Sequence, residues 1–189
     1  LQEVPPKLSG SLEIDRDAAQ RIIDLGCSAS PPRLTETESK RLLAAYGIPV
    51  NRTELATERG EAAQMARKVG FPVVMKIASR DILHKTDANG VRLNVRNETE
   101  ALQAFDSIMD QARGYAQQAA LDGVSVQPMA RHIDCELILG SKKDEDFGPI
   151  ILFGMGGILT EVLGDRSIGL PPLNRLLARR LIQETKVYR

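Results

Sequence analysis

Residues 73–95 carry the clearest pattern of apolar and polar positions in the chain. Residues 73–78 (VVMKIA) form an apolar run that Lys76 interrupts, and residues 91–95 (VRLNV) alternate between apolar and polar side chains. Alternation with a period of two is typical of a half-buried strand, so the pattern predicts two strands joined by a loop. Residues 79–90 make this loop longer than the roughly two to five residues that a plain hairpin requires. Its length favours a binding role.

The polar side chains of this segment suit a polyphosphate ligand. Lys76 lies in an otherwise apolar strand, and a partly buried ammonium group requires an anion nearby. The loop adds an imidazole, a second ammonium group, a hydroxyl group and a turn that tolerates positive φ: His84, Lys85, Thr86, and Asn89 with Gly90. The chain contains no GxxxxGKS/T phosphate-binding loop. The alternative is a surface hairpin in which Lys76 and His84 are solvated, and the loop alone does not decide between the two.

Helix-start signals organise much of the remaining chain. Thr35 and Glu38 have the spacing of a capping box, which predicts a helix that runs to Tyr46 and ends at Gly47. Further helices are predicted over residues 15–26 (N-cap Asp15, stop Gly26), over residues 58–69, from Asn97 and from Asn174. Strands are predicted over residues 53–56, 124–129, 135–140 and 149–153, with a charged turn over 141–146. Because the strands come in pairs with helices between the pairs, we expect an α+β fold.

Composition excludes several functional classes. The 189 residues are 42% hydrophobic and 26% charged, with a formal net charge of zero, so neither nucleic acid nor a membrane surface is an expected partner. No apolar run approaches the roughly 20 residues of a membrane span, and no signal peptide is recognisable. Cys27 and Cys135 lack the spacing of metal ligands and suit a reducing cytoplasm. The first residue, Leu1, and the basic stretch at the end indicate a domain excised from a longer protein.

Three features after residue 123 could complete a nucleotide site, each with a plainer alternative. Pro128 interrupts the strand around Gln127 and Met129, which could free backbone groups for an adenine edge or could mark an edge strand. Glu136 could accept a ribose hydroxyl or face solvent. Glu161 and Asp165 could hold Mg²⁺ together with phosphate oxygens, or be an acidic pair on a helix surface.

Together these residues resemble the ATP-grasp domain of ADP-forming (NDP-forming) acyl-CoA synthetases. The resemblance rests on residues 71–79 (FPVVMKIAS), residues 81–87 (DILHKTD), residues 147–157 (FGPIILFGMGG) and the acids Glu161 and Asp165. Residues 34–40 (LTETESK) and 46–49 (YGIP) fit as well, so the resemblance covers about residues 12–187. One departure is Asn89 in the turn before Val91, where the family has glycine; asparagine tolerates positive φ, so we expect the turn to survive.

The resemblance implies an ATP-grasp fold of two α+β lobes with the nucleotide between them. We expect a linker with one short helix over residues 1–33, a first lobe over 34–122 and a second, incomplete lobe over 123–189. By resemblance, the nucleotide is bound by Lys76, Lys85, Thr86, Gly90, Gln127, Met129 and Glu136. Glu161 and Asp165 hold Mg²⁺, while His84 and Lys85 act on the phosphates.

The implied reaction converts an acid, ATP and CoA to acyl-CoA, ADP and phosphate. In this family, the loop histidine, here His84, is proposed to take up the phosphoryl group near the nucleotide, which suits a neutral imidazole. The CoA-binding and CoA-ligase domains would belong to the same or a partner chain. The alternative is a nucleotide-sensing domain without turnover in a larger fusion, such as a protein acetyltransferase.

Overall fold

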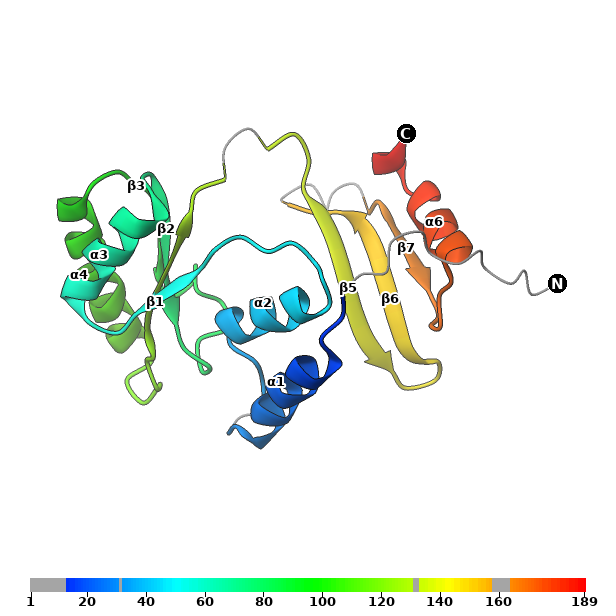
Figure 1. The fold of residues 1–189 in the computed structure, drawn as a ribbon, viewed down its shortest axis with the longest axis horizontal. Helices are drawn as coiled ribbons and strands as arrows, with labels where there is room; N and C mark the ends of the chain where they lie inside the picture. Colours follow the sequence, from blue (N-terminus) through cyan, green and yellow to red (C-terminus); the bar gives the residue numbers. More distant parts are fainter. Residues whose placement is uncertain (1–12, 31, 131–132, 158–163) are drawn as a thin grey trace. The chain divides into compact units, whose positions relative to one another are not determined.

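The computed structural model describes residues 13–30, 32–130, 133–157 and 164–189 (Figure 1). The described residues form two compact units, which we call the first unit (residues 13–130) and the second unit (from residue 133 onward). Each contains an antiparallel sheet and helices, so the predicted α+β class is confirmed. Within the described ranges, no helix combines the length and apolar character needed to cross a membrane.

The first unit contains a four-stranded antiparallel sheet in the order β1-β4-β2-β3. Its strands are β1 (Glu54–Ala56), β2 (Val73–Ala78), β3 (Val91–Val95) and β4 (Gly123–Pro128). Its helices are α1 (Arg16–Ser28), α2 (Glu36–Ala45), α3 (Arg59–Val69) and α4 (Glu98–Tyr115). The predicted pair of strands on either side of residues 79–90 is therefore present, and β2 is a central strand between β3 and β4.

Alternation along β2 and β4 separates a core face from a polar face. Val73, Met75 and Ile77 have no exposed surface, and they form one hydrophobic cluster with Val124 and Val126 of β4 and with side chains of α3 and α4. Residues paired across an antiparallel ladder share a face. Lys76 pairs with Ser125 and Val74 pairs with Gln127, so these polar side chains lie on the face opposite the core. The sheet thus supports polar residues on a rigid apolar layer.

The predicted helix starts are confirmed by side-chain caps. The side chains of Asp15, Thr35, Asn97 and Asn174 each accept a hydrogen bond from a backbone N–H of the first turn that follows. The predicted stop at Gly26 is wrong, because α1 continues to Ser28. A side chain at position 26 would collide with Leu34, so this glycine permits close packing rather than ending the helix.

The second unit contains a three-stranded antiparallel sheet in the order β5-β6-β7, followed by two helical segments. The strands are β5 (Leu137–Asp144), β6 (Gly148–Met155) and β7 (Arg166–Gly169), and the helices are α6 (Arg175–Gln183) and the 3-10 helix η1 (Lys186–Tyr188). The predicted turn over residues 141–146 is wrong in its first half, because β5 extends to Asp144 as the partner of β6. The Asp144 carboxylate then caps the turn by accepting the N–H groups of Asp146 and Phe147.

β4 belongs to the sheet of the first unit, where it pairs with both β1 and β2. The predicted boundary after residue 122 therefore differs from the division between the compact units, which follows Ala130. A strand hydrogen-bonded on both sides cannot be separated from its sheet, and sequence order alone did not reveal this pairing.

Candidate functional site

Lys76 is the charged residue on the polar face of β2. Its side chain is 28% exposed, while the residues on either side of it in the strand, Met75 and Ile77, are completely buried. Because neighbouring side chains of a strand point to opposite faces, Lys76 is held by a rigid strand and directed away from the core. This placement agrees with the predicted partly buried ammonium group that requires an anion.

The loop of residues 79–90 is anchored by two buried apolar side chains, Ile82 and Ala88. Between them, His84 and Thr86 are exposed, whereas Lys85 is only partly exposed. The loop backbone folds back on itself, because N–H groups of residues 87–90 donate to the carbonyl oxygens of residues 84–86. The N–H groups of Asn89 and Gly90 are therefore paired with carbonyl oxygens of the loop itself.

The turn that closes the loop has two specialised positions. Asn89 adopts a φ of 49°, which confirms that asparagine supports the turn. Gly90 does not need positive φ; a Cβ there would lie 2.5 Å from Cγ2 of Ile77 and 3.1 Å from the Lys85 carbonyl oxygen. Gly90 also accepts the N–H of Ile77 at 2.7 Å, which ties the end of the loop to β2. Its role is therefore close packing that fixes the loop beside Lys76.

Three lysine ammonium groups surround the carboxylate of Glu36, in the first turn of α2. Oε1 of Glu36 lies 3.0 Å from Nζ of Lys40 and 3.4 Å from Nζ of Lys76, and Oε2 lies 3.1 Å from Nζ of Lys85. The lysines come from α2, β2 and the loop, so tertiary folding brings them together. We call these four residues the lysine cluster.

Burial raises the pKa of Glu36, but the hydrogen bond from Lys40 and the charges of Lys76, Lys40 and Lys85 outweigh it and lower the pKa to about 2. The carboxylate therefore stays ionised at neutral pH and offsets part of the repulsion among the lysines. Three ammonium groups against one carboxylate leave two positive charges in excess. Such an excess favours a multiply charged anion as ligand.

A second ionic group lies beside the lysine cluster. The Arg80 guanidinium donates to Oε1 of Glu38 at 2.5 Å and to the backbone carbonyl of Arg33. Burial raises the pKa of Glu38, but hydrogen bonds from Thr35 and Arg80 outweigh it, so the pKa is lowered from its usual value. The same carboxylate completes the capping box of α2 by accepting the N–H of Thr35 at 2.7 Å. Glu38 thus joins the start of α2 to the beginning of the loop.

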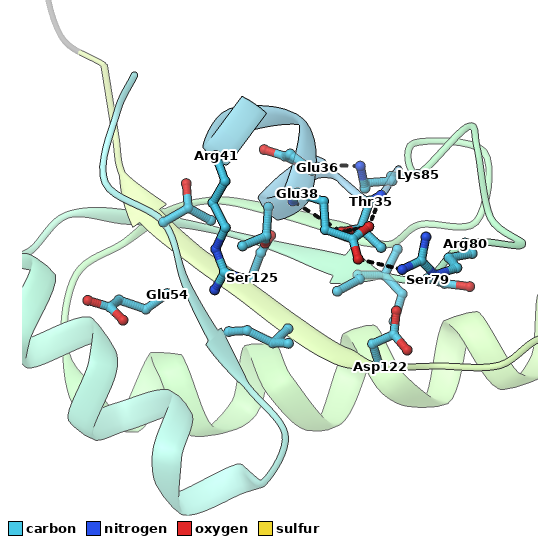
Figure 2. A pocket seen from close by; sticks show the side chains of 15 residues that line it. Thr35, Glu36, Glu38, Arg41, Glu54, Ser79, Arg80, Lys85, Asp122 and Ser125 are labelled. Atoms are coloured by element: carbon cyan, nitrogen blue, oxygen red, sulfur yellow. Dashed lines mark hydrogen bonds and ion pairs between the residues drawn. The ribbon is translucent and has the colours of Figure 1, made fainter. Parts of the chain in front are cut away.

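A pocket of about 460 Å³ opens beside these two ionic groups, within the first unit (Figure 2). Figure 2 shows Lys85 directed toward Glu36, and Arg80 directed toward Glu38. The lining side chains are mostly polar: Thr35, Glu36, Thr37, Glu38, Arg41, Thr53, Glu54, Leu55, Ile77, Ala78, Ser79, Arg80, Lys85, Asp122 and Ser125. The lining carries both carboxylates and cationic groups, so the pocket suits a hydrophilic ligand better than an apolar one.

The residues predicted to bind adenine lie at the end of β4. Gln127 is 4% exposed, and its Oε1 accepts hydrogen bonds from Nζ of Lys40 at 2.6 Å and from Nδ2 of Asn51 at 3.1 Å. The backbone N–H of Met129 donates to the Pro72 carbonyl at 3.2 Å. The Gln127 side chain is thus joined to the lysine cluster through Lys40, a link that strand periodicity does not reveal. Adenine binding by this segment stays a prediction.

Glu136 lies just before β5 rather than inside a strand as predicted. Its carbonyl accepts the N–H of Gly156 at 2.7 Å, and its carboxylate lies against Gly157, where a Cβ would collide with Oε2. Two glycines of the FGMGG run therefore allow the Glu136 backbone and side chain to approach β6 closely. The predicted contact of Glu136 with ribose stays a prediction.

Of the two predicted metal ligands, Glu161 lies outside the described residues. Asp165 is 6% exposed, and its two carboxylate oxygens accept the N–H groups of Lys186 and Val187, each at 2.7 Å. These bonds hold η1 next to the start of β7, while each oxygen keeps a lone pair that a cation could use. Over the described parts of the chain, no three His, Cys, Asp or Glu side chains cluster as metal ligands. The Mg²⁺ ligand pair stays a prediction.

Sequence analysis missed Glu36, Lys40 and Arg80 as site residues. The capping box over residues 35–38 predicts a helix start, and the family resemblance of residues 34–40 assigns no role to single residues there. Glu36 and Lys40 nevertheless have the i,i+4 spacing of an ion pair on a helix. That spacing could have indicated a pair, but not its contact with Lys76, which is 40 residues away in sequence.

Comparison with known proteins places the chain in a family. The profile of the ATP-grasp domain family matches residues 28–189. The chain is 41% identical over 175 residues to acetate–CoA ligase (ADP-forming) I subunit beta of Pyrococcus furiosus, covering 93% of this chain and 75% of that subunit. It is 39% identical over 185 residues to 4-hydroxybutyrate–CoA ligase (ADP-forming) of Nitrosopumilus maritimus, covering 98% of this chain but only 26% of that protein. The chain thus spans about a quarter of the second relative's length.

Two solved structures with the same fold are of dinucleotide forming acetyl-coenzyme A synthetase 1 of Ca. Korarchaeum cryptofilum. One, in complex with coenzyme A and Ca-AMPCP, has a TM-score of 0.81 and 37% identity, covering 89% of this chain and 74% of that one. Another, with coenzyme A and Mg-AMPPCP and its phosphohistidine segment pointing towards the nucleotide binding site, has a TM-score of 0.68 and 34% identity, covering 92% and 72%. The chain belongs to the ATP-grasp domain family, in the group that includes the beta subunits of ADP-forming acetate–CoA ligases.

Proposed function

We propose that this chain is the nucleotide-binding module of an ADP-forming acyl-CoA synthetase, which converts an acid, ATP and CoA to acyl-CoA, ADP and phosphate. The observation that carries the proposal is that Lys76 and Lys85 approach one anionic position, the carboxylate of Glu36. The exposed His84 directly precedes Lys85 in the chain. The similarity to ligase beta subunits and to a synthetase that binds AMPCP and AMPPCP supports the same function.

In this proposal, Lys76 and Lys85 bind the phosphate groups of ATP or ADP. Their ammonium groups come from a central strand and from an anchored loop, so two donors are held near one phosphate position. Charge-assisted hydrogen bonds of this kind are stronger than neutral ones, which suits an anionic ligand. Thr86 and Gly90 contribute to the same loop, the segment of Gln127 and Met129 meets the adenine, and Glu136 meets the ribose.

His84 is the proposed acceptor of the phosphoryl group. A ring nitrogen of the neutral imidazole donates its lone pair to the γ-phosphorus while the bond from phosphorus to the β–γ bridging oxygen breaks. ADP leaves with that electron pair, and its charge is balanced by the nearby lysines. Exposure of His84 at the loop surface allows the phosphoryl group to pass on to another domain.

Mg²⁺ is the proposed companion of the nucleotide, with Glu161 and Asp165 as its ligands. When bound, the ion would neutralise phosphate charge as it develops. The remaining chemistry requires CoA-binding and CoA-ligase domains on the same or a partner chain. We also propose a cytoplasmic location, in which the exposed free thiols of Cys27 and Cys135 stay reduced.

The test is calorimetric titration of ATP with Mg²⁺ into the wild-type chain and into Lys76→Ala. Loss of one charge-assisted contact is expected to weaken binding by about ten- to a hundredfold. Lys68→Ala is a matched control: the Lys68 side chain is 63% exposed, and its ammonium group lies 3.4 Å from the Glu54 carboxylate. Wild-type binding that Lys76→Ala leaves unchanged would refute the assigned role of Lys76.

His84→Ala separates an enzyme from a nucleotide sensor. The variant is expected to bind ATP with wild-type affinity, because phosphate affinity comes from the lysines, yet to take up no phosphoryl group. The readout is transfer of labelled γ-phosphate to protein after the CoA-ligase domains of a related synthetase are supplied. If the wild-type chain binds ATP but is never labelled under these conditions, a sensing role replaces the catalytic one.

A further inference from the structure

The carboxylate of Glu36 bridges the two lysines that would bind phosphate. One oxygen lies 3.4 Å from Nζ of Lys76 and the other lies 3.1 Å from Nζ of Lys85. Two oxygens of a single phosphate group could bridge two ammonium groups in the same way. Glu36 therefore occupies the position of an anionic ligand relative to these lysines.

Lys40 differs from the other two lysines because its donors are fully used. Its ammonium group contacts Oε1 of Glu36 at 3.0 Å, Oγ1 of Thr53 at 2.7 Å and Oε1 of Gln127 at 2.6 Å. An ammonium group has three N–H donors, so Lys40 has none left for a ligand. Its partners on α2, β4 and the segment before β1 make it a fixed anchor for Glu36.

Lys76 and Lys85 are the exchangeable members of the lysine cluster. Within the described residues, Glu36 provides the side-chain acceptor for each of them, so each keeps further N–H donors that can meet a phosphate. Their side chains are 28% and 24% exposed, and Lys85 lines the pocket, where a ligand can reach it. A phosphate group can therefore replace Glu36 on these two lysines, while Lys40 retains the carboxylate.

We propose that Glu36 is a resident counter-ion that competes with phosphate for Lys76 and Lys85 and thereby sets the affinity of the site. Building on the proposed function, the phosphate groups of an incoming nucleotide displace Glu36 from the two lysines. Glu36 pairs with both lysines again when the nucleotide leaves. The competition weakens binding, which promotes release of product in an enzyme that must bind and release nucleotide in every cycle. Without Glu36, the lysines would hold phosphate more tightly.

The test is calorimetric titration of inorganic tripolyphosphate and of ATP, both without metal, into wild type and Glu36→Gln. Because glutamine is neutral and similar in size, the variant is expected to bind both ligands about tenfold more tightly, the gain from removing one charge-assisted competitor. Glu98→Gln is the matched control: Glu98 is also the first residue of a helix and is paired with an arginine, Arg67, at 2.7 Å. The affinity of Glu98→Gln for tripolyphosphate is expected to stay within twofold of the wild-type affinity.

A double variant distinguishes competition from a merely structural role. In a Lys76→Ala background, Glu36 competes with phosphate for Lys85 alone. The gain in phosphate affinity from Glu36→Gln is therefore expected to be smaller than in wild type. An unchanged affinity in Glu36→Gln would overturn the proposal, because it would show that the carboxylate does not compete with phosphate. A weakened affinity would overturn it too, because it would show that the carboxylate positions the lysines.

The two ligands also separate this inference from the proposed function. Tighter binding of tripolyphosphate with no ATP binding would support the counter-ion and refute the nucleotide module, whereas no binding of either ligand to any variant would refute both.

Discussion

At the scale of single residues, the candidate site depends on charged side chains that are only partly exposed to solvent. The side chains of Glu36, Lys40, Lys76 and Lys85 are all between 19% and 28% exposed. Ion pairs at this depth interact more strongly than fully exposed pairs, which contribute little to stability. The same carboxylate that we propose as a competitor of phosphate also offsets repulsion among three lysines. Its ionisation is therefore expected to affect stability as well as affinity.

Acid titration tests the ionisation of Glu36. The pKa of Glu36 is about 2 in the folded chain against 4.5 for an ordinary glutamate, so its ionisation stabilises the fold above about pH 4.5. This contribution is lost as pH falls from about 4.5 toward 2, and we expect it to be on the order of 1–2 kcal/mol after allowance for solvent screening.

The measurement is urea unfolding of wild type and Glu36→Gln at pH 6 and pH 3. The free energy of unfolding of wild type should fall more between these two values than that of the variant. An equal fall in both proteins would show that Glu36 has an ordinary pKa in the folded state.

At the scale of elements, β2 and β4 determine where the site residues lie. Their inward side chains build the core against α3 and α4, while Lys76, Ser125 and Gln127 lie on the opposite face. A shift of one residue in register would exchange these faces, so burial of the apolar set fixes the polar set as well. The start of β4 adds a further constraint, because Gly123 adopts a φ of 131° next to Ala56 of β1.

Gly123→Ala is expected to destabilise the chain by about 2 kcal/mol or more. A Cβ at this position would collide with the carbonyl oxygen of Ala56, and the backbone conformation is one that alanine rarely adopts. Gly114→Ala is the control: Gly114 is exposed in α4 with open space around it, so alanine should stabilise the helix by up to about 1 kcal/mol. Thermal unfolding of both variants checks the prediction, and equal melting temperatures would contradict it.

At the scale of the whole molecule, the two compact units differ in how much apolar surface they bury. The cluster of buried core residues lies entirely in the first unit. In the described part of the second unit, Leu181 is the buried hydrophobic residue, while Leu139 on β5 and Ile168 on β7 are 71% and 56% exposed. Because hydrophobic burial is the main source of stability, the two units are expected to open with different free energies.

Hydrogen exchange of the intact chain, followed by mass spectrometry, tests this difference. Amides of β2 and β4 should exchange most slowly, because both strands are buried, and β2 is hydrogen-bonded on both sides. Amides of β5 and β6 should exchange well before them, since few buried apolar side chains oppose their opening. Equal protection of β6 and β2 would show that the second unit is stabilised as strongly as the first.

The sequence by itself determined most elements of this protein, because their signals are local. Side-chain caps at Asp15, Thr35, Asn97 and Asn174 mark helix starts within a few residues. An apolar run identifies β2, and alternation identifies β3. The resemblance carried by the HKTD and FGMGG runs identified the family without any structure, because both runs are short and contiguous.

Only the tertiary structure decided which charges meet and which glycines serve packing. Contacts of Glu36 with Lys76 and Lys85 join residues 40 and 49 positions apart, and no local pattern specifies such a pairing. Likewise, Gly26 and Gly90 looked like a stop and a turn, but each packs closely against a side chain of another segment, Leu34 and Ile77 respectively. The physical reason is the same in both cases: caps and alternation depend on neighbouring residues, whereas electrostatic partners and steric contacts depend on which distant segments the folded core brings together.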